Sequence, residues 1–575
     1  DLRIKENHAA DEHKSHLLLV PSGELQRTVA DDAQHTLPNF RQGDAIVLYE
    51  RNADTDNVTN KMVFKGNIDY LNENEICIRL RATQQNSSVL PSDSLYAIEH
   101  DAMDTTFRSM YQGLYAFMSA TKERRDLLLS QREPQFDVAL DKQIAEAADD
   151  FTRIALKAKA AKDYFLLVGP PGTGKTSCAL KKMVETFYKE EGAQILLLSY
   201  TNRAVDEICK ALSSIRPEVD FIRVGSELSC DENYRDHLIE NELATCMRRT
   251  EVCERINRCR ILVGTVASIS GKPELFRLKH FDVAIVDEAT QILEPQLLGI
   301  LCAKGENGKE GVGKFILIGD HKQLPAVVLQ NTEQSEVYDE ALSAVGLKNL
   351  KDSLFERLYR TARQHTDAHR TYDMLCRQGR MHPEVALFAN QAFYEGRLLP
   401  VGLPHQLEDS GNINRLSFYP SQPEPMGSSA KTNHSEAKIA ARLAATVYKE
   451  HSEAFDASRT LGIITPYRSQ IALIKKEIEV LGISELNQIL IDTVERFQGS
   501  ERDVIIYSFC VNYPYQLKFL SNLTEEDGIL IDRKLNVALT RARKQMLLTG
   551  VPTLLERNPL YKSLLKLIES LRNIA

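Results

Sequence analysis

The chain has 575 residues, 43% of them hydrophobic, so it is long enough to bury more than one core and is expected to form roughly two to four domains. Its formal net charge of −9 argues against a globally basic, histone-like nucleic-acid binder. No apolar run approaches the roughly 20 residues of a membrane span and no signal-peptide pattern opens the chain, so we expect no membrane partner and a cytoplasmic location, or a nuclear one in a eukaryote.

The first residue is Asp1 rather than Met, so we expect a fragment and leave an upstream domain open. The ten cysteines include no C-x-x-C pair. Their nearest cluster, Cys246, Cys253 and Cys259, is too widely spaced for a zinc framework and favours reduced structural thiols.

The first 150 residues are predicted to hold three parts. Residues 1–42 show no period and are interpreted as an arm whose order stays open. In residues 43–98, short β-branched runs alternate with Asn, Asp and Gly, which predicts a small β-barrel. In residues 99–150, "TTFRSMYQGLYAFMSATKERRDLLLSQ" has apolar residues at helical spacing and no proline, which predicts a long stalk helix.

Two series of apolar runs follow, separated by helical patterns. The first holds "YFLLV", "QILLLSY", "CRILVGT", "FDVAIVDE" and "KFILIGD", and the second holds "LGIITPY", "QILIDTV", "RDVIIYSF" and "QMLLTG". Continuous apolar runs of this length are typical of parallel strands buried on both faces. The fold is therefore predicted to be α/β, with two tandem domains of parallel sheet at 151–360 and 361–575 and a helical insertion at about 226–258.

A glycine-rich loop lies between a predicted strand and a predicted helix and fits G-x-x-x-x-G-K-[ST]. Such a loop turns backbone N–H groups around phosphates, and the helix N-terminus adds its positive dipole end. We therefore predict binding of a nucleoside triphosphate, with Lys175 at the β- and γ-phosphates and Thr176 on Mg²⁺. The alternative, an ordinary glycine turn, is disfavoured by the context. The loop consists of Gly169, Pro170, Pro171, Gly172, Thr173, Gly174, Lys175 and Thr176.

Asp287 and Glu288 end the strand "FDVAIV". One carboxylate can hold magnesium and the next can activate an attacking water, so we assign Asp287 to the metal and Glu288 to catalysis. Taken alone, the pair would more often cap a helix, but the upstream loop reverses that preference.

Hydrolysis that drives movement needs a sensor of the γ-phosphate and arginines that stabilise the transition state, preferably from a second domain. Gln323 in "GDHKQLP" is the candidate sensor, and Arg380 in "QGRMHPE" is one candidate arginine. Arg541 and Arg543 in "LNVALTRARKQ" are the other candidate arginines.

Ten blocks occur in order: "GPPGTGKT", "SYTNRAVDEI", "VDEATQILEP", "GDHKQLPAVV", "SLFERL", "QGRMHPEV", "TNHSEA", "IITPYRSQ", "DTVERFQGSERDVIIYSF" and "LNVALTRAR". They resemble the motifs of superfamily 1B helicases, the family that includes the RNA helicase of nonsense-mediated decay and the nuclease-helicase that trims Okazaki-fragment flaps. The resemblance implies two RecA-like motor domains, a barrel on a helical stalk that grips nucleic acid, and ATP-driven 5′-to-3′ movement along a single strand.

The resemblance also implies further contacts. Glu501 matches a nucleotide-contacting position. Small hydroxyl and amide groups at strand ends suit phosphate gripping without base readout, although each alone is equally ordinary turn chemistry. By the same resemblance, the strand would be contacted by Ser199, Thr201, Asn202, Thr265, Pro466, Arg468 and Thr493.

Two departures affect the base pocket. The family's aromatic residue before the arginine of "QYRMHP", which lies near the adenine, is Gly379 here, and Gln143 is a poor match for the family's adenine-reading glutamine. We therefore predict that GTP competes well with ATP and that Gly379→Tyr tightens ATP binding. The alternative is that Gly379 takes a positive φ and that another residue, such as Tyr467, covers the base.

The predicted function is that of an ATP-dependent helicase or translocase on single-stranded nucleic acid, and a monomer is expected. "DEATQ" and the barrel and stalk before the first motor domain are closer to the DNA-acting branch, so DNA is favoured over RNA. The alternatives are an RNA helicase of the same family, a nucleotide-controlled clamp that does not unwind, and a subunit whose chemistry lies in an upstream domain.

Overall fold

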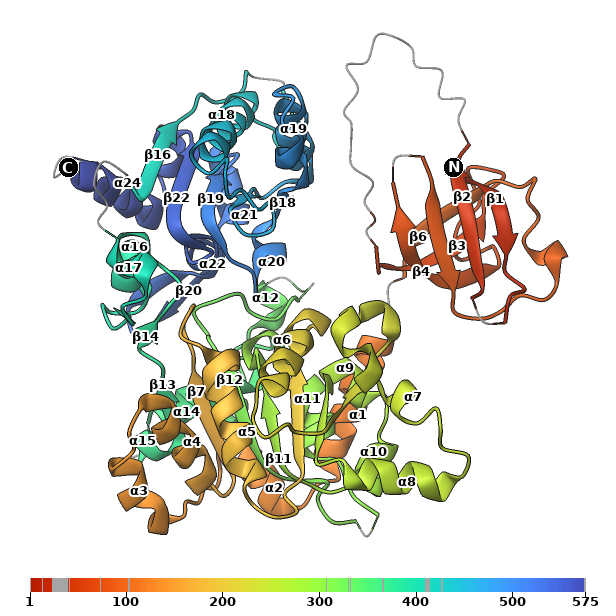
Figure 1. Ribbon diagram of the computed structural model, residues 1–575, viewed down its shortest axis with the longest axis vertical. Coiled ribbons are helices and arrows are strands. Elements are labelled where there is room, and N and C mark those ends of the chain that lie inside the picture. Colours follow the sequence, from red (N-terminus) through yellow and green to blue (C-terminus); the bar gives the residue numbers. More distant parts are fainter. Residues whose placement is uncertain are drawn as a thin grey trace. The chain divides into compact units, whose positions relative to one another are not determined.

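The computed structural model describes residues 2–12, 14–22, 40, 42–72, 74–101, 104–306, 308–328, 330, 332–364, 367–408, 414–425 and 428–572 (Figure 1). The chain forms two compact units: Asp1–Arg108 with Ser226–Ser229, and Ser109–Gly225 with Cys230–Ala575. Among the helices of the described residues, none is both long and apolar enough to cross a membrane.

The N-terminal unit is a closed six-stranded barrel with the strand order β1-β2-β5-β4-β3-β6, which confirms the predicted barrel. The arm predicted for 1–42 was wrong for its first half, because β1 and β2 are barrel strands, and residues 23–39 lie outside the described part. The barrel strand β1 shows no alternation because Ile4 is its only buried residue. The strands are β1 (Leu2–His8), β2 (His16–Pro21), β3 (Ala45–Glu50), β4 (Val63–Leu71), β5 (Ile76–Leu80) and β6 (Tyr96–His100).

The segment after the barrel is a series of short helices, so the prediction of one long stalk helix was wrong. Thr121 interrupts it: its side chain accepts a hydrogen bond from the Arg124 N–H at 3.3 Å and starts a new helix. Leu127 and Leu128 then enter the core of the first α/β domain. The helices are α1 (Asp104–Met118), α2 (Lys122–Leu128), α3 (Asp141–Ala145) and α4 (Asp150–Ala160).

Helix α1 contacts α11 (Glu294–Leu301) backbone to backbone. A Cβ atom at Gly113 would lie 1.9 Å from the Pro295 carbonyl oxygen, and one at Gly299 would lie 3.4 Å from the Gly113 Cα. Glycine is therefore required at Gly113 for this crossing.

Gly113→Ala is expected to destabilise the larger unit by about 1 to 3 kcal/mol, because the added methyl group cannot fit against Pro295 without moving one helix. Alanine would otherwise favour the helix by about 1 kcal/mol. The midpoint of chemical or thermal unfolding measures the effect. Gly271→Ala is the control, since its Cβ would lie an ordinary 3.5 Å from the Ala267 carbonyl oxygen; equal effects of the two substitutions would contradict the prediction.

The first α/β domain has a seven-stranded parallel sheet with the order β13-β7-β12-β11-β8-β10-β9. Strand β13 pairs with β7, so the domain boundary predicted at 360/361 was wrong and the first sheet extends to Met374. β13 has three residues, too few for a pattern. The strands are β7 (Tyr164–Val168), β8 (Ile195–Ser199), β9 (Phe221–Val224), β10 (Ile261–Thr265), β11 (Phe281–Val286), β12 (Val312–Gly319) and β13 (Tyr372–Met374).

Both faces of this sheet are covered, because alternate strand residues enter two separate cores. Phe165 and Leu167 pack with α4, α5 (Lys181–Tyr188) and α6 (Asn202–Ser213). Leu166 and Val168 pack with α2, α11 and α14 (Leu354–Ala362) on the opposite face. The segment predicted as an insertion holds α7 (Ile239–Glu242) and α8 (Arg249–Arg258).

The second α/β domain has a five-stranded parallel sheet with the order β16-β22-β19-β17-β18, which confirms the predicted fold of two tandem RecA-like domains. Helices α18 (His434–Glu450) and α19 (Arg468–Glu479) cover one face, and α16 (Pro383–Phe393), α22 (Arg533–Leu539) and α24 (Pro559–Arg572) cover the other. The strands are β16 (Leu416–Pro420), β17 (Leu461–Ile464), β18 (Leu490–Asp492), β19 (Arg502–Ser508) and β22 (Ala542–Gly550), with a separate hairpin of β20 (Leu523–Glu526) and β21 (Ile529–Asp532).

Candidate nucleotide-binding site

The glycine-rich loop connects β7 to a helical turn over Lys175–Leu180 that continues as α5. Gly172 and Gly174 have φ values of 74° and 77°, which L-residues rarely adopt. A Cβ at Gly169 would lie 2.1 Å from the Lys175 Cγ, so this glycine leaves room for the lysine stem. The loop thus has the backbone needed to surround phosphates.

Two contacts join the loop to the end of β11. The Lys175 Nζ lies 3.0 Å from the Glu288 Oε1, and the Thr176 hydroxyl donates to the Asp287 carboxylate at 2.5 Å. Mg²⁺ is usually bound by one or two protein oxygens, substrate phosphates and water, so Thr176 and Asp287 fit the predicted metal position. The predicted phosphate and metal residues therefore lie together.

Burial and charge act on the ionisable groups of this cluster. Burial, and then the neighbouring Glu288, raise the pKa of Asp287 to about 6. For Glu288, burial favours the neutral form, but Lys175 outweighs it and lowers the pKa. For Lys175, burial is likewise outweighed by Glu288 and Asp287, and the pKa is raised. Of the two carboxylates, Glu288 therefore keeps its negative charge to lower pH.

Glu288 also has an unusual backbone, with φ at 53°. The left-handed region is disfavoured for a residue with a side chain and occurs preferentially at functional sites. Its carboxylate is held by Lys175 on one oxygen and by the Gln291 side chain, which donates to the other at 3.0 Å. The side chain is thus fixed beside the loop.

Gln323 follows β12 and meets the second domain. Its Oε1 accepts a hydrogen bond from the Arg541 Nη2 at 3.3 Å, and its amide donates to Asp320 at 2.8 Å. The same carboxylate oxygen of Asp320 accepts from the Tyr394 hydroxyl at 2.7 Å, which in turn accepts from Asn536 at 2.8 Å. The residues predicted as sensor and arginine are therefore linked across the two domains. Sequence reasoning missed Asp320, although it lies in the same block as Gln323.

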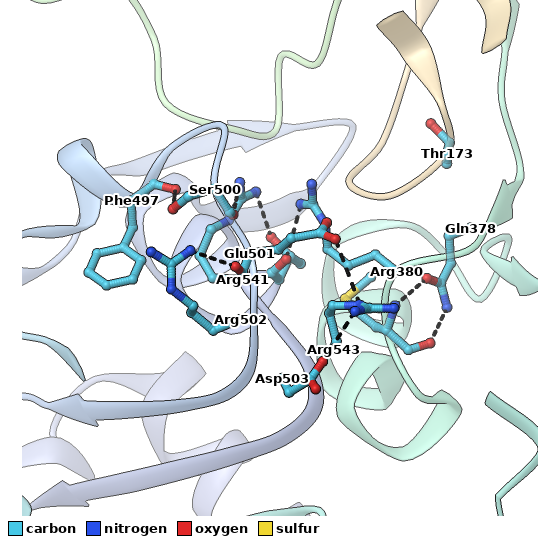
Figure 2. A network of polar contacts seen from close by, with 12 residues as sticks. Thr173, Gln378, Arg380, Phe497, Ser500, Glu501, Arg502, Asp503, Arg541 and Arg543 are labelled. Atoms are coloured by element: carbon cyan, nitrogen blue, oxygen red, sulfur yellow. Dashed lines mark hydrogen bonds and ion pairs between the residues drawn. The ribbon is translucent and has the colours of Figure 1, made fainter. Parts of the chain in front are cut away.

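Arginines of the second domain surround Glu501 (Figure 2). Glu501 accepts from the Arg380 Nε at 2.6 Å and lies 3.7 Å from the Arg543 Nε. Arg541 is buried beside them and donates to the Ser500 carbonyl at 3.3 Å. Burial, followed by the nearby Arg380, lowers the pKa of Arg541 to about 9. A bound γ-phosphate would relieve this crowding of like charges.

Comparisons with known proteins agree with this arrangement. One family model, described as an AAA domain, matches residues 145–252 and 241–331, and a second with the same description matches 350–553. The chain is 27% identical over 590 residues to the "DNA replication ATP-dependent helicase/nuclease DNA2" of Bos taurus, covering 93% of this chain and 50% of that one. It is 28% identical to the Homo sapiens protein of that name and 29% to the Xenopus laevis one, each over 84% of this chain and 46% of the relative. The family models and these relatives support an assignment to the superfamily 1B helicases.

The chain spans about half the length of the curated relatives that it matches. A solved structure, a complex of the arterivirus nonstructural protein 10 helicase with DNA, aligns with a TM-score of 0.33 and 16% identity over 69% of this chain and 62% of that one. That likeness is too weak to bear on fold or function.

The residues predicted to contact the strand lie at the carboxyl ends of strands in both helicase domains. Thr201 and Thr265 cap α6 and α9 (Val266–Ser270), accepting from the N–H groups of Ala204 at 3.2 Å and Ser268 at 3.0 Å. Ser199 is fully buried and donates to the Asp287 carbonyl at 3.2 Å, so the prediction of a side-chain strand contact was wrong there. The other four lie at the N-termini of helices or just before them: Asn202, Pro466, Arg468 and Thr493.

Gly379, Tyr467 and Gln143 are the residues that the sequence relates to the base of the nucleotide. Gly379 has no positive φ, so the alternative that glycine serves a left-handed backbone was wrong. The Tyr467 hydroxyl, suggested as a substitute, accepts from the Gln516 amide at 3.1 Å in the second domain. Gln143 is exposed on α3.

A hairpin of the second helicase domain, β20–β21, contacts the first. Its Glu526 lies 2.8 Å from the His321 Nε2 and accepts from the Arg363 Nη1 at 3.1 Å. Burial alone would raise the pKa of Glu526, but His321 and Arg363 outweigh it and hold the pKa at about 2. The contact therefore holds the two domains together without passing through the nucleotide site.

Glu526→Gln is expected to lower the free energy of unfolding of the larger unit by about 1 to 3 kcal/mol at pH 7. The folded pKa of Glu526 is depressed, so its contribution is present above the unfolded pKa of about 4.3 and is lost as pH falls toward 2. Unfolding midpoints of both proteins at several pH values test this. The exposed neighbour Glu525→Gln is the control, and a difference that persists unchanged at pH 2 would refute the ionic explanation.

Proposed function

We propose that this chain is an ATP-dependent helicase that moves 5′-to-3′ along single-stranded nucleic acid and favours DNA. The observation that supports it most is the link between Gln323 of the first domain and Arg541 of the second. A sensor and an arginine shared between domains let hydrolysis change the domain contact. The relatives whose names describe DNA replication helicase/nucleases support DNA as the substrate.

The proposed roles follow the geometry. The loop from Gly169 to Thr176 would hold the triphosphate, and Lys175 would exchange its contact with Glu288 for the β- and γ-phosphates. Thr176 and Asp287 would hold Mg²⁺, which when bound neutralises phosphate charge. Glu288, released from Lys175, would accept the proton of the attacking water.

The arginines would complete the site from the second domain. Arg541 already reaches Gln323, and Arg380 is positioned by Glu501. We propose that both point their charge at the γ-phosphate as it leaves, and that Glu501 holds Arg380 until the nucleotide arrives. Phosphate release would then change how the two domains contact each other, and we propose that this change moves the strand.

Single strands would lie across the carboxyl ends of both sheets. The N-termini of α6 and α9 would present backbone N–H groups to phosphates, with Asn202 and the Thr201 and Thr265 caps beside them. Arg468 and Thr493 would do the same from the second domain, with Pro466 beside them just before α19. Such contacts grip the backbone without reading bases.

Strand displacement tests this function. Duplexes with a 5′ or a 3′ single-stranded tail, in matched DNA and RNA versions, are incubated with ATP and Mg²⁺, and both turnover and release of the strand are measured. We expect turnover stimulated by DNA and release only from the 5′-tailed duplex. Stimulated turnover without release would favour the clamp, and stronger stimulation by RNA would favour the RNA helicase.

A further inference from the structure

The segment around Gly379 is placed directly against the phosphate loop. The Gly379 N–H donates to the Gly172 carbonyl at 2.8 Å. The short strand β14 (Arg377–Gln378) pairs in parallel with β15 (Leu399–Pro400), and the Val401 N–H donates to the Gln378 carbonyl at 3.2 Å. Residues 401–403 are therefore brought beside Gly379 and the loop.

Two aliphatic side chains border the space that a side chain at Gly379 would enter. A Cβ atom built there would lie 3.1 Å from the Leu403 Cδ1 and 3.3 Å from the Val401 Cγ2, and outside residues 378–380 no other atom of the described residues lies within 4 Å. Val401 and Leu403 are 46% and 41% exposed. What distinguishes this exposed aliphatic pair is its place beside the phosphate loop, where an apolar part of a bound nucleotide could cover it.

These two residues are held in place by a buried side chain. Gln406 accepts hydrogen bonds from the N–H groups of Gly402 at 3.1 Å and Leu403 at 3.2 Å, and its amide donates to the Gln378 carbonyl at 2.9 Å. Gly402 has a φ of 88°, which only glycine adopts readily. The aliphatic surface is thus preorganised rather than a mobile loop tip.

We propose that Val401 and Leu403 form the platform on which the purine of the nucleotide packs. This rests on the proposed function, because it assumes that the loop from Gly169 to Thr176 binds the triphosphate. Covering an aliphatic surface with the face of either purine is favourable because apolar surface leaves water, and such a surface offers no hydrogen bonds that could distinguish the two bases. The platform therefore contributes affinity without distinguishing adenine from guanine.

The test compares ATP with tripolyphosphate, which has the same phosphates and no base. Binding of each, with Mg²⁺, is measured by calorimetry to the wild type and to the double variant Val401→Ser with Leu403→Ser. Loss of the apolar contact is expected to weaken ATP about five- to tenfold and to leave tripolyphosphate unchanged. GTP is expected to weaken by the same factor as ATP.

Matched variants separate the platform from disturbance of the loop. Leu407→Ser removes a 73% exposed leucine of α17 (Pro404–Leu407) and should leave ATP affinity unchanged, and Leu403→Met should retain it because it keeps an apolar side chain. The platform would be overturned if the double variant lost affinity for ATP and tripolyphosphate equally, or if its ATP affinity were unchanged. It would also be overturned if the double variant lost affinity for ATP but not for GTP. If the wild type binds neither ATP nor tripolyphosphate, the proposed function fails and the platform fails with it. If the wild type hydrolyses ATP and the double variant binds ATP as tightly as the wild type does, the platform alone fails.

Discussion

Lys175→Ala is expected to abolish nucleotide turnover, with a loss in kcat/KM of at least about 100-fold. The ammonium is the cation that the loop itself supplies for the β- and γ-phosphates, and it lies 3.0 Å from the Glu288 carboxylate. Its removal deletes phosphate positioning and also leaves Asp287 and Glu288 without their buried counter-ion, which favours their protonation. Phosphate release during steady-state turnover with saturating single-stranded DNA measures the effect.

A second lysine on the following helix provides the control. Lys182 lies 3.9 Å from Glu185 in an exposed ion pair, which contributes little. Lys182→Ala should therefore keep wild-type turnover and show that the helix tolerates substitution. Turnover of Lys175→Ala within a few fold of wild type would remove the loop from the mechanism.

Glu288→Gln is expected to bind nucleotide normally and to hydrolyse it about 10² to 10⁴ times more slowly, the usual loss when a general base is removed. Glutamine has nearly the same shape, and its oxygen can still accept from Lys175 while its NH₂ group donates to Gln291 after that amide flips, but the proton acceptor is lost. Nucleotide affinity should stay or improve, because one negative charge near the γ-phosphate disappears. Single-turnover hydrolysis and equilibrium binding of ATP separate the two effects.

Glu274→Gln, at the exposed start of α10 (Glu274–Leu278), is the matched control and should leave both quantities unchanged. Loss of nucleotide binding together with hydrolysis would indicate a structural role for Glu288. Substantial turnover in both Glu288→Gln and Lys175→Ala would contradict the assignment of this site as an NTP hydrolase.

The architecture of the two α/β domains was predictable because parallel strands buried on both faces are continuous apolar runs. Short strands carried no such signal. β13 has three residues, and its place in the first sheet depends on pairing with β7, which lies about 200 residues earlier. β1 was missed because the barrel buries only Ile4 of that strand.

The site was predictable where a motif dictates backbone geometry, as in the glycine loop and the Asp287–Glu288 pair. It was not predictable where contacts join distant segments. The burial of Ser199 beside the Asp287 carbonyl follows from the pairing of β8 with β11. The placement of Val401 and Leu403 follows from the pairing of β14 with β15. Neither leaves a pattern in the local sequence.

The contact between Gly113 and α11 has a mechanical consequence. α11 begins six residues after Glu288, and α1 is the helix through which the chain arrives from the barrel, four residues after β6 ends. Two backbones in direct contact have no side chain between them to compress, so a shift of α11 displaces α1 by a similar amount. If nucleotide binding beside Glu288 shifts α11, α1 shifts with it, and thermodynamic linkage then lets the position of α1 alter nucleotide affinity in return.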